Sequence, residues 1–216
     1  MALLLQLIAG LVLLLLVLVV RIWLVLRSPD THRAARKGHV SLLVVAGSGG
    51  HTTEILRLLN SLSISYSPIH YVLADTDKMS EDKIRSFESA KVNGIPKSLY
   101  TIHRIPRSRE VRQSWSSSVV TTIQSFLYSF PLTVRLKPDL ILCNGPGTCI
   151  PVCFSALLLG ILGIKKVIVV YVESLCRVES LSLSGRLLYY IADYFIVQWP
   201  LLKDKYPKSM YLGRIV

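Results

Sequence analysis

An uncharged stretch rich in Leu and Val near the start of the sequence most strongly constrains how this chain can fold. Residues 2–20 contain no charged side chain, and beyond Arg21 the apolar character continues to Leu26. A helix needs about 20 apolar residues to cross a bilayer. A cleaved signal peptide would have a basic start, a shorter apolar core and a small-residue cleavage site, which this stretch lacks. We therefore expect residues 1–26 to form a retained transmembrane anchor.

Basic side chains follow the apolar stretch and predict its orientation. They are Arg21, Arg27, Arg33, Arg36 and Lys37. Positive charge next to a membrane span stays on the cytosolic side. We expect a single-pass protein with a lumenal N-terminus, a basic linker over residues 27–39 and a cytosolic domain over residues 40–216.

Charge and cysteine content narrow the class of protein. The formal net charge of +12 fits nucleic acid, an anionic membrane surface or a ligand that carries phosphate. The sequence has no RNA-binding signature and no zinc-finger spacing, so we expect membrane lipids and phosphate, and no nucleic acid. Its cysteines form no C-x-x-C pair, which favours buried reduced thiols over disulfides or a metal site: Cys143, Cys149, Cys153 and Cys176.

Apolar runs that alternate with helical patterns predict the fold of residues 40–216. Continuous apolar strands are typical of a parallel sheet that helices cover on both faces. The prediction is an α/β domain with a Rossmann-like, doubly wound parallel sheet. Strands are expected at 40–46, 70–74, 99–104, 139–143, 166–172 and 194–198, and helices at 51–62, 79–87, 110–136, 149–164, 184–192 and 201–206.

Two of these predicted helices leave membrane contact open. Pro131 predicts a kink or break in the helix at 110–136, whose aromatic residues lie near a basic segment. Residues 149–164 are uncharged but fall short of the about 18 residues of a membrane span. A helix buried against the sheet is the main interpretation of 149–164, and shallow membrane contact is the alternative.

A glycine-rich loop follows the first predicted strand. It consists of Gly47, Ser48, Gly49, Gly50 and His51. Free N–H groups and the macrodipole at a helix N-terminus attract anions, and glycines let a phosphate approach the backbone. The next residue is threonine, where a dinucleotide fingerprint needs glycine or alanine and a P-loop needs glycine before lysine. The loop predicts a phosphate or diphosphate site of another kind, with a plain turn as the alternative.

Further candidate ligand-binding residues follow later strands. Ligands bind at the carboxyl ends of strands in open α/β sheets. One group follows the fourth predicted strand and comprises Asn144, Gly145, Gly147 and Thr148, with Thr148 a candidate N-cap of the next helix. Glu173 and Ser174 follow the fifth strand, and Arg177, close behind, is a candidate salt-bridge partner of Glu173.

The segment 103–112 is rich in arginine. Arg104, Arg107 and Arg109 are candidates for phosphate contacts, because the guanidinium group suits planar bidentate binding. A solvated surface is the alternative. Asp75 and Asp77 form a D-x-D pair, but two acids beside a turn are common, and we expect no metal site.

Several segments together resemble one protein family. The GSGGH loop is similar to the glycine-rich loop in the acceptor-binding half of GT-B glycosyltransferases that add N-acetylglucosamine to lipid diphosphates. The whole chain resembles the membrane-anchoring subunits of the eukaryotic UDP-N-acetylglucosamine transferase of asparagine-linked glycosylation. The segments that carry the resemblance are GSGGHTTEILRLL (47–59), the Arg109–Glu110 region, NGPGTC (144–149), YVES (171–174) followed by Arg177, and DYFIVQW (193–199).

The resemblance implies a division of labour between two chains. A GT-B enzyme has two Rossmann domains with the active site between them, and this chain has room for one. The other half would be a separate soluble subunit that binds the donor UDP-GlcNAc, so no tightly bound cofactor is expected here. Together they would add, with inversion, the second GlcNAc to dolichyl-diphosphate-GlcNAc at the cytosolic face of the endoplasmic reticulum membrane. The chain alone would be inactive.

The same resemblance suggests roles for site residues. Gly47, Ser48, Gly49 and Gly50 would contact the acceptor's diphosphate. An inverting transfer needs a base for the acceptor hydroxyl, which His51 would supply, with Glu173 as the alternative base. A positioning role for His51 stays open. The main rival is a non-catalytic membrane scaffold for the partner, and the first candidate docking surface is the apolar end at 211–216.

Overall fold

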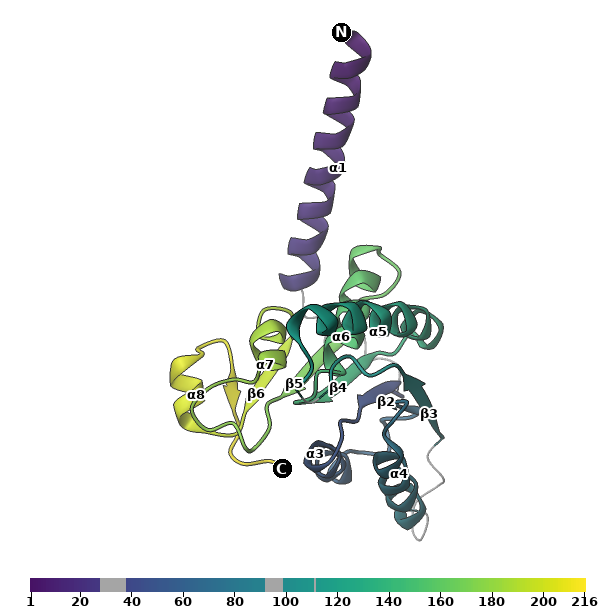
Figure 1. The fold of residues 1–216 in the computed structure, drawn as a ribbon, viewed down its shortest axis with the longest axis vertical. Coiled ribbons are helices and arrows are strands. Elements are labelled where there is room, and N and C mark those ends of the chain that lie inside the picture. The colour runs from purple at the N-terminus through teal and green to yellow at the C-terminus, as the bar shows by residue number, and fades with distance from the viewer. Residues whose placement is uncertain (28–37, 92–98, 111) are drawn as a thin grey trace.

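A computed structural model describes residues 1–27, 38–91, 99–110 and 112–216. Most of the predicted basic linker, including Arg33, Arg36 and Lys37, lies outside the described residues. The chain folds as one long N-terminal helix that stands on an α/β domain (Figure 1).

The domain is built on one parallel sheet, as predicted. Within the described residues, seven strands follow the order β3-β2-β1-β4-β5-β6-β7, and each neighbouring pair is parallel. They are β1 (Leu42–Val45), β2 (Ile69–Ala74), β3 (Tyr100–Ile105), β4 (Leu140–Asn144), β5 (Ile168–Val172), β6 (Tyr194–Val197) and β7 (Met210–Tyr211). The central strands are buried on both faces, which explains why their sequences are continuously apolar.

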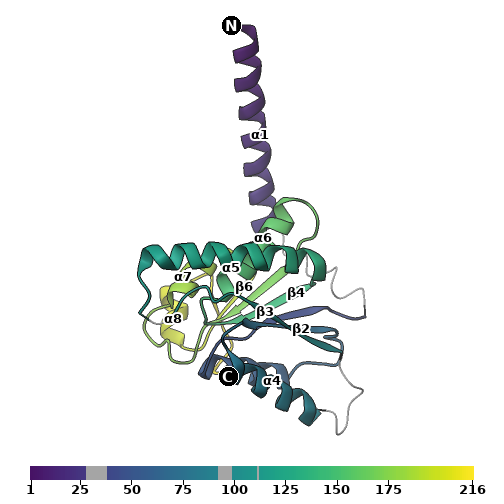
Figure 2. The same cartoon turned by 45° about the vertical axis from the view of Figure 1, so that its right-hand side comes forward.

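Helices cover both faces of this sheet (Figure 2). One face carries α3 (Gly50–Asn60) and α4 (Lys78–Lys91), and the face nearer the N-terminal helix carries α5 (Trp115–Leu136), α6 (Cys149–Ile161) and α7 (Leu183–Leu188). The last helix, α8 (Pro200–Lys205), connects β6 to β7. The predicted doubly wound, Rossmann-like architecture is confirmed.

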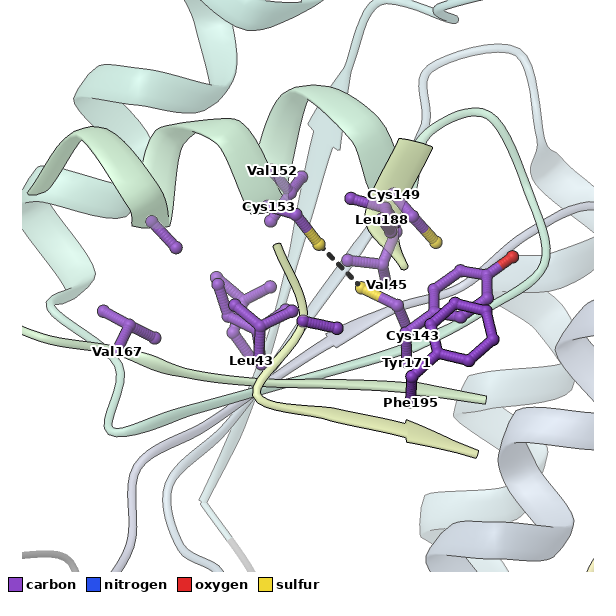
Figure 3. Close-up of a cluster of buried hydrophobic side chains, with 14 of the residues drawn as sticks. Leu43, Val45, Cys143, Cys149, Val152, Cys153, Val167, Tyr171, Leu188 and Phe195 are labelled. Carbon is purple, nitrogen blue, oxygen red and sulfur yellow. Dashed lines mark hydrogen bonds between the residues drawn. The ribbon is translucent and has the colours of Figure 1, made fainter. Parts of the chain in front are cut away.

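Alternate residues of each strand feed two separate cores. Leu43 and Val45 point toward α6, whereas Leu42 and Val44 pack against α3. Figure 3 shows the core on the α6 side, where the Cys143 and Cys153 sulfurs lie 3.5 Å apart. Cys143, Cys149 and Cys153 are buried free thiols, as predicted, whereas Cys176 is exposed.

The ends of several helices differ from the sequence prediction; the helix predicted at 184–192, for example, ends at Leu188. The predicted helix at 110–136 begins at Trp115, because the Ser114 hydroxyl accepts a hydrogen bond from the Ser117 N–H and caps it. It continues through Pro131, so the predicted break is wrong; Pro131 is exposed, where a missing backbone hydrogen bond is tolerated. The predicted helix at 149–164 ends at Ile161, because Gly163 takes a φ of +73°.

The N-terminal helix α1 (Ala2–Arg27) is long and apolar enough to cross a membrane, which is consistent with the predicted anchor. Its last turn packs on α6 at Gly160, where a Cβ atom would lie 2.9 Å from Val25 Cγ1. Lys166 Nζ donates to the Val25 carbonyl and pairs with Asp193 at 2.9 Å. This end of the helix is therefore fixed against the body.

The helix α6 is a buried core helix rather than a second span. It has 13 residues, and most of its side chains are buried under α5 and against the sheet. Large apolar side chains are nevertheless exposed on α5 and just beyond α6. They include Val119, Val120, Ile123, Leu127, Leu162 and Ile164.

Candidate functional site

The loops after β1 and β4, which both contain glycine, meet at the point where the order of strands along the sheet reverses. The strands β1 and β4 are neighbours, yet the helices that follow them lie on opposite faces. Such a switch point opens a crevice at the carboxyl ends of the strands, where ligands bind in this class of fold. A Cβ atom on Gly47 would lie 2.7 Å from Pro146 Cβ, so only glycine lets the two loops pack this closely.

The side chain of His51 lies between these loops. Its Nδ1 is 3.1 Å from Asn144 Oδ1. An amide oxygen only accepts hydrogen bonds, so Nδ1 carries the hydrogen and Nε2 of the neutral ring keeps its lone pair. The ring packs on Gly145, whose φ is +68°, and a Cβ there would lie 2.6 Å from His51 Nδ1. The structure thus orients the His51 ring so that its free nitrogen is Nε2.

A carboxylate with one buried oxygen lies next to His51. Glu54 Oε2 is 4.0 Å from His51 Nδ1, and Glu54 Oε1 accepts a hydrogen bond of 2.9 Å from the Ser174 hydroxyl. Ser174 follows β5, so this contact joins the first helix of the domain to a strand end 120 residues later. The predicted residue Ser174 therefore reaches the site through Glu54.

The start of α3 offers uncapped backbone N–H groups. Its N-cap residue Gly49 provides no side-chain cap and has a φ of +66°. A Cβ atom added there would meet nothing within 4 Å, so the backbone is open to a ligand. Ser48, Gly49 and Gly50 are exposed beside His51. This arrangement suits an anion, as predicted from the sequence.

A cavity of about 680 Å³ joins these loops to an apolar wall. Its polar end contains Ser48, His51, Gly145, Gly147 and Thr148, with two acids, Asp77 and Glu110, and four arginines, Arg107, Arg109, Arg112 and Arg177. Its apolar wall comes from α5, α6 and α7 and contains Trp115, Val119, Ile123, Ile150, Leu183 and Leu187. The cavity therefore suits a ligand with an anionic part and an apolar part.

Two arginines are held in place at this cavity. The Arg109 guanidinium lies 4.3 Å from the centre of the Trp115 ring, and Arg107 Nε donates to Thr76 Oγ1 at 2.9 Å. Stacked and hydrogen-bonded guanidinium groups lose less freedom when they bind a phosphate. The structure thus brings Arg107 and Arg109 together with the glycine loops.

Arg104 lies elsewhere. It forms an ion pair with Glu81 of α4, and both residues line a second cavity that does not include His51. Side chains alternate across a strand, and Arg104 belongs to β3, whereas Arg107 and Arg109 follow it. The structure does not group Arg104 with the other predicted phosphate-binding residues.

Glu173 is buried below the cavity rather than in its wall. Its carboxylate accepts hydrogen bonds from the Ser182 N–H at 3.0 Å, the Ser182 hydroxyl at 3.1 Å and the Ser174 N–H at 3.1 Å. Burial raises the pKa of Glu173 above its usual value, and the hydrogen bonds oppose this shift. Its predicted role as a base stays a prediction, and the donors to its carboxylate are these serines and the Tyr171 hydroxyl, at 3.5 Å, rather than Arg177.

Thr148 lines the cavity and occupies the N-cap position of α6, as predicted, but its side chain does not cap the helix. Its backbone has helical angles, φ −59° and ψ −21°, and its side chain makes no capping hydrogen bond. An N-cap side chain works from an extended backbone, as at Ser114. The hydroxyl of Thr148 is therefore not used by the start of this helix.

Comparison with known proteins identifies the family. The family described as "Oligosaccharide biosynthesis protein Alg14 like" matches residues 42–215. The chain belongs to the Alg14 family. It is 67% identical over 202 residues to the human UDP-N-acetylglucosamine transferase subunit ALG14, covering 92% of each chain. The subunit of the same name from Yarrowia lipolytica is 43% identical over 176 residues, covering 81% of each.

A solved structure supports the fold of this Alg14-family chain. The crystal structure of Acinetobacter baumannii MurG matches with a TM-score of 0.53 at 18% sequence identity. The match covers 75% of this chain and 42% of MurG, so the chain spans less than half the length of that protein. Both the predicted family and the predicted GT-B-like fold are confirmed.

Sequence reasoning missed one residue of the site. Glu54 stands three residues after His51 on α3, a spacing that places two side chains side by side on a helix. That spacing is visible in the sequence. Its partner Ser174 was predicted only as a ligand-binding residue.

The D-x-D pair has a structural role at Asp77. The Asp77 carboxylate accepts hydrogen bonds from the Ser80 N–H at 3.1 Å and the Ser80 hydroxyl at 2.7 Å, at the start of α4. Among the residues that the structure describes, no group of three or more His, Cys, Asp or Glu side chains is arranged to hold a metal ion.

Thr52, next to His51, donates a hydrogen bond from its hydroxyl to the Gly47 carbonyl and fixes the loop.

Proposed function

We propose that this chain is the membrane-anchored, acceptor-binding subunit of a two-chain UDP-GlcNAc transferase. It adds the second GlcNAc to dolichyl-diphosphate-GlcNAc in the synthesis of N-glycan precursors. It works in the endoplasmic reticulum membrane, with α1 as the anchor and the body in the cytosol. The observation that carries the proposal is one cavity that combines an oriented histidine, phosphate-binding groups and an apolar wall.

The cavity matches the parts of such an acceptor. The uncapped start of α3 and the arginines Arg107, Arg109 and Arg177 suit a diphosphate. The apolar side chains of α5 and α7 suit the first units of a lipid chain. The sugar hydroxyl then lies near His51, because the glycine loop and the histidine are adjacent in the chain.

The chemistry of His51 follows from its hydrogen bond to Asn144. Nε2 accepts the proton of the acceptor hydroxyl while that oxygen attacks the anomeric carbon of the donor sugar. The bond from that carbon to the UDP oxygen breaks, and UDP leaves with the bonding electrons. Attack from the side opposite the leaving group inverts the anomeric centre.

The donor site belongs to a second, soluble subunit in this proposal. Relatives of this chain are named subunits of a transferase, which supports a partner chain that supplies the donor site. Tyr211 and Leu212 are exposed near the C-terminus and are our first candidates for its docking surface.

A transfer assay tests this proposal. The full chain in detergent is incubated with UDP-GlcNAc and a dolichyl-diphosphate-GlcNAc analogue, first alone and then with the soluble partner. We expect transfer only with the partner present. Transfer by the chain alone would contradict the division of labour, and no transfer by a verified complex would contradict the proposed acceptor.

A non-catalytic scaffold is the second candidate, and the variant His51→Gln separates it from the first. If His51 is the base, this variant loses about 10²–10⁴-fold in kcat while it still binds the partner. His103→Gln is the matched control, because His103 lies on β3 and lines the cavity that does not contain His51. Full activity of His51→Gln in the complex would favour the scaffold.

A further inference from the structure

The carboxylate of Glu54 is placed in an unusual way. Its side chain is 14% exposed, and within the described part of the chain its Oε2 atom is buried without a hydrogen-bond partner. The other oxygen, Oε1, accepts the hydrogen bond from Ser174. A buried carboxylate oxygen without a partner is costly. Its placement therefore calls for a positive charge close by.

His51 is the group that can supply this charge. Its Nδ1 lies 4.0 Å from Glu54 Oε2, and the two residues stand at i and i+3 on the first turn of α3. The Nδ1 hydrogen is directed to Asn144, so a proton taken up by the ring goes to Nε2. The ring then becomes a cation next to a buried anion, where attraction is stronger than in water.

We propose, on the basis of the function proposed above, that Glu54 is a positioning residue for the transfer reaction. Together with Asn144 it keeps the hydrogen of His51 on Nδ1, so that Nε2 faces the acceptor hydroxyl. It also stabilises the positive charge that His51 gains as it takes the hydroxyl proton. Glu54 itself neither gains nor loses a proton and does not touch the acceptor.

The variant Glu54→Gln removes the charge and keeps the shape. The glutamine Oε1 can still accept the hydrogen bond from the Ser174 hydroxyl, so the link between α3 and the end of β5 remains. We expect kcat of the complex to fall roughly 10²-fold, the low end of what a general base contributes, while KM for the acceptor is unchanged. Glu54→Asp restores the charge and should recover part of this loss. Glu179→Gln makes the same chemical change at an exposed position and should leave activity unchanged.

A purely structural role for Glu54 predicts a different pattern. In that case Ser174→Ala, which breaks the link but keeps the charge, lowers the melting temperature, and Glu54→Gln keeps wild-type kcat. Wild-type kcat in Glu54→Gln would overturn the proposal.

A second measurement keeps the inference testable if the proposed function fails. Should the wild-type complex transfer no GlcNAc, the proposed function is wrong. The effect of Glu54 on the His51 tautomer is then measured by ¹⁵N NMR of the full chain with its partner in detergent. The His51 signals, assigned with His51→Gln, should show hydrogen on Nδ1 in the wild type and a mixture of both tautomers in Glu54→Gln. Identical tautomers in both proteins would overturn the proposal.

Discussion

Replacing Gly145 with alanine tests whether the position of His51 controls activity. Gly145 has a φ of +68°, a conformation that costs an L-residue about 1–2 kcal/mol. The new Cβ would also lie 2.6 Å from His51 Nδ1 and force the ring away from Asn144. Losing that hydrogen bond adds about 1 kcal/mol. We expect a total destabilisation of about 2–3 kcal/mol from these two terms.

Gly38→Ala is the matched control for backbone strain. Gly38 has a φ of +69°, and a Cβ atom there meets nothing within 4 Å. It shares the strain of Gly145 without the contact to His51. For a protein of this size, about 1 kcal/mol shifts the melting temperature by about 2–4 °C, so Gly145→Ala should melt about 2–4 °C below Gly38→Ala.

The activity of these two variants separates stability from catalysis. Thermal unfolding in detergent gives the melting temperatures, and GlcNAc transfer by the complex at a temperature where both variants are folded gives kcat. We expect Gly145→Ala to lose at least about 10²-fold in kcat, because the base is displaced, and Gly38→Ala to keep wild-type kcat. Equal kcat in both variants would refute the claim that packing on Gly145 positions the catalytic base.

Three further predictions follow from single contacts. Burial raises the pKa of Glu173, so its contribution to the free energy of unfolding is present at acidic pH and is lost as the pH rises. The melting temperature of Glu173→Gln relative to wild type should therefore be higher at neutral pH than near pH 4, and a constant difference across this pH range would contradict the argument. Arg109→Lys keeps the charge but loses the stacking on Trp115, so KM for the acceptor should rise several-fold while kcat changes little, in steady-state assays; an unchanged KM would remove Arg109 from the binding site. Lys166→Ala should loosen the anchor, which spin labels on α1 and α6 would report as a broader distance distribution, whereas an unchanged distribution would show that this lysine does not hold it.

The parallel sheet, and the edge of it where the candidate site lies, could be predicted from the sequence. Continuous apolar strands indicated a parallel sheet, and the ends of parallel strands meet at one edge, which brings 47–51 and 144–148 together. The sequence also showed residue types that suit phosphate. These inferences rest on periodicity and topology, which are properties of the chain itself.

Pairings between distant side chains could not be predicted in the same way. Arg104 and Arg107 look alike in the sequence, but one pairs with Glu81 and the other lines the cavity. Thr148 was expected to cap a helix, but its backbone angles are helical. Each outcome depends on where a neighbour lies in three dimensions, and local sequence does not carry that information.

The contact between α1 and α6 has a consequence for how the chain would meet the proposed lipid acceptor. A tether that pivots freely would let the domain tumble beneath a bilayer and present its cavity in any direction. Here the last turn of α1 contacts Gly160 and Lys166, so the domain keeps one orientation relative to the helix axis. If α1 crosses a bilayer, the domain cannot rotate out of the membrane plane. The cavity and a lipid ligand then find one another by lateral diffusion in two dimensions.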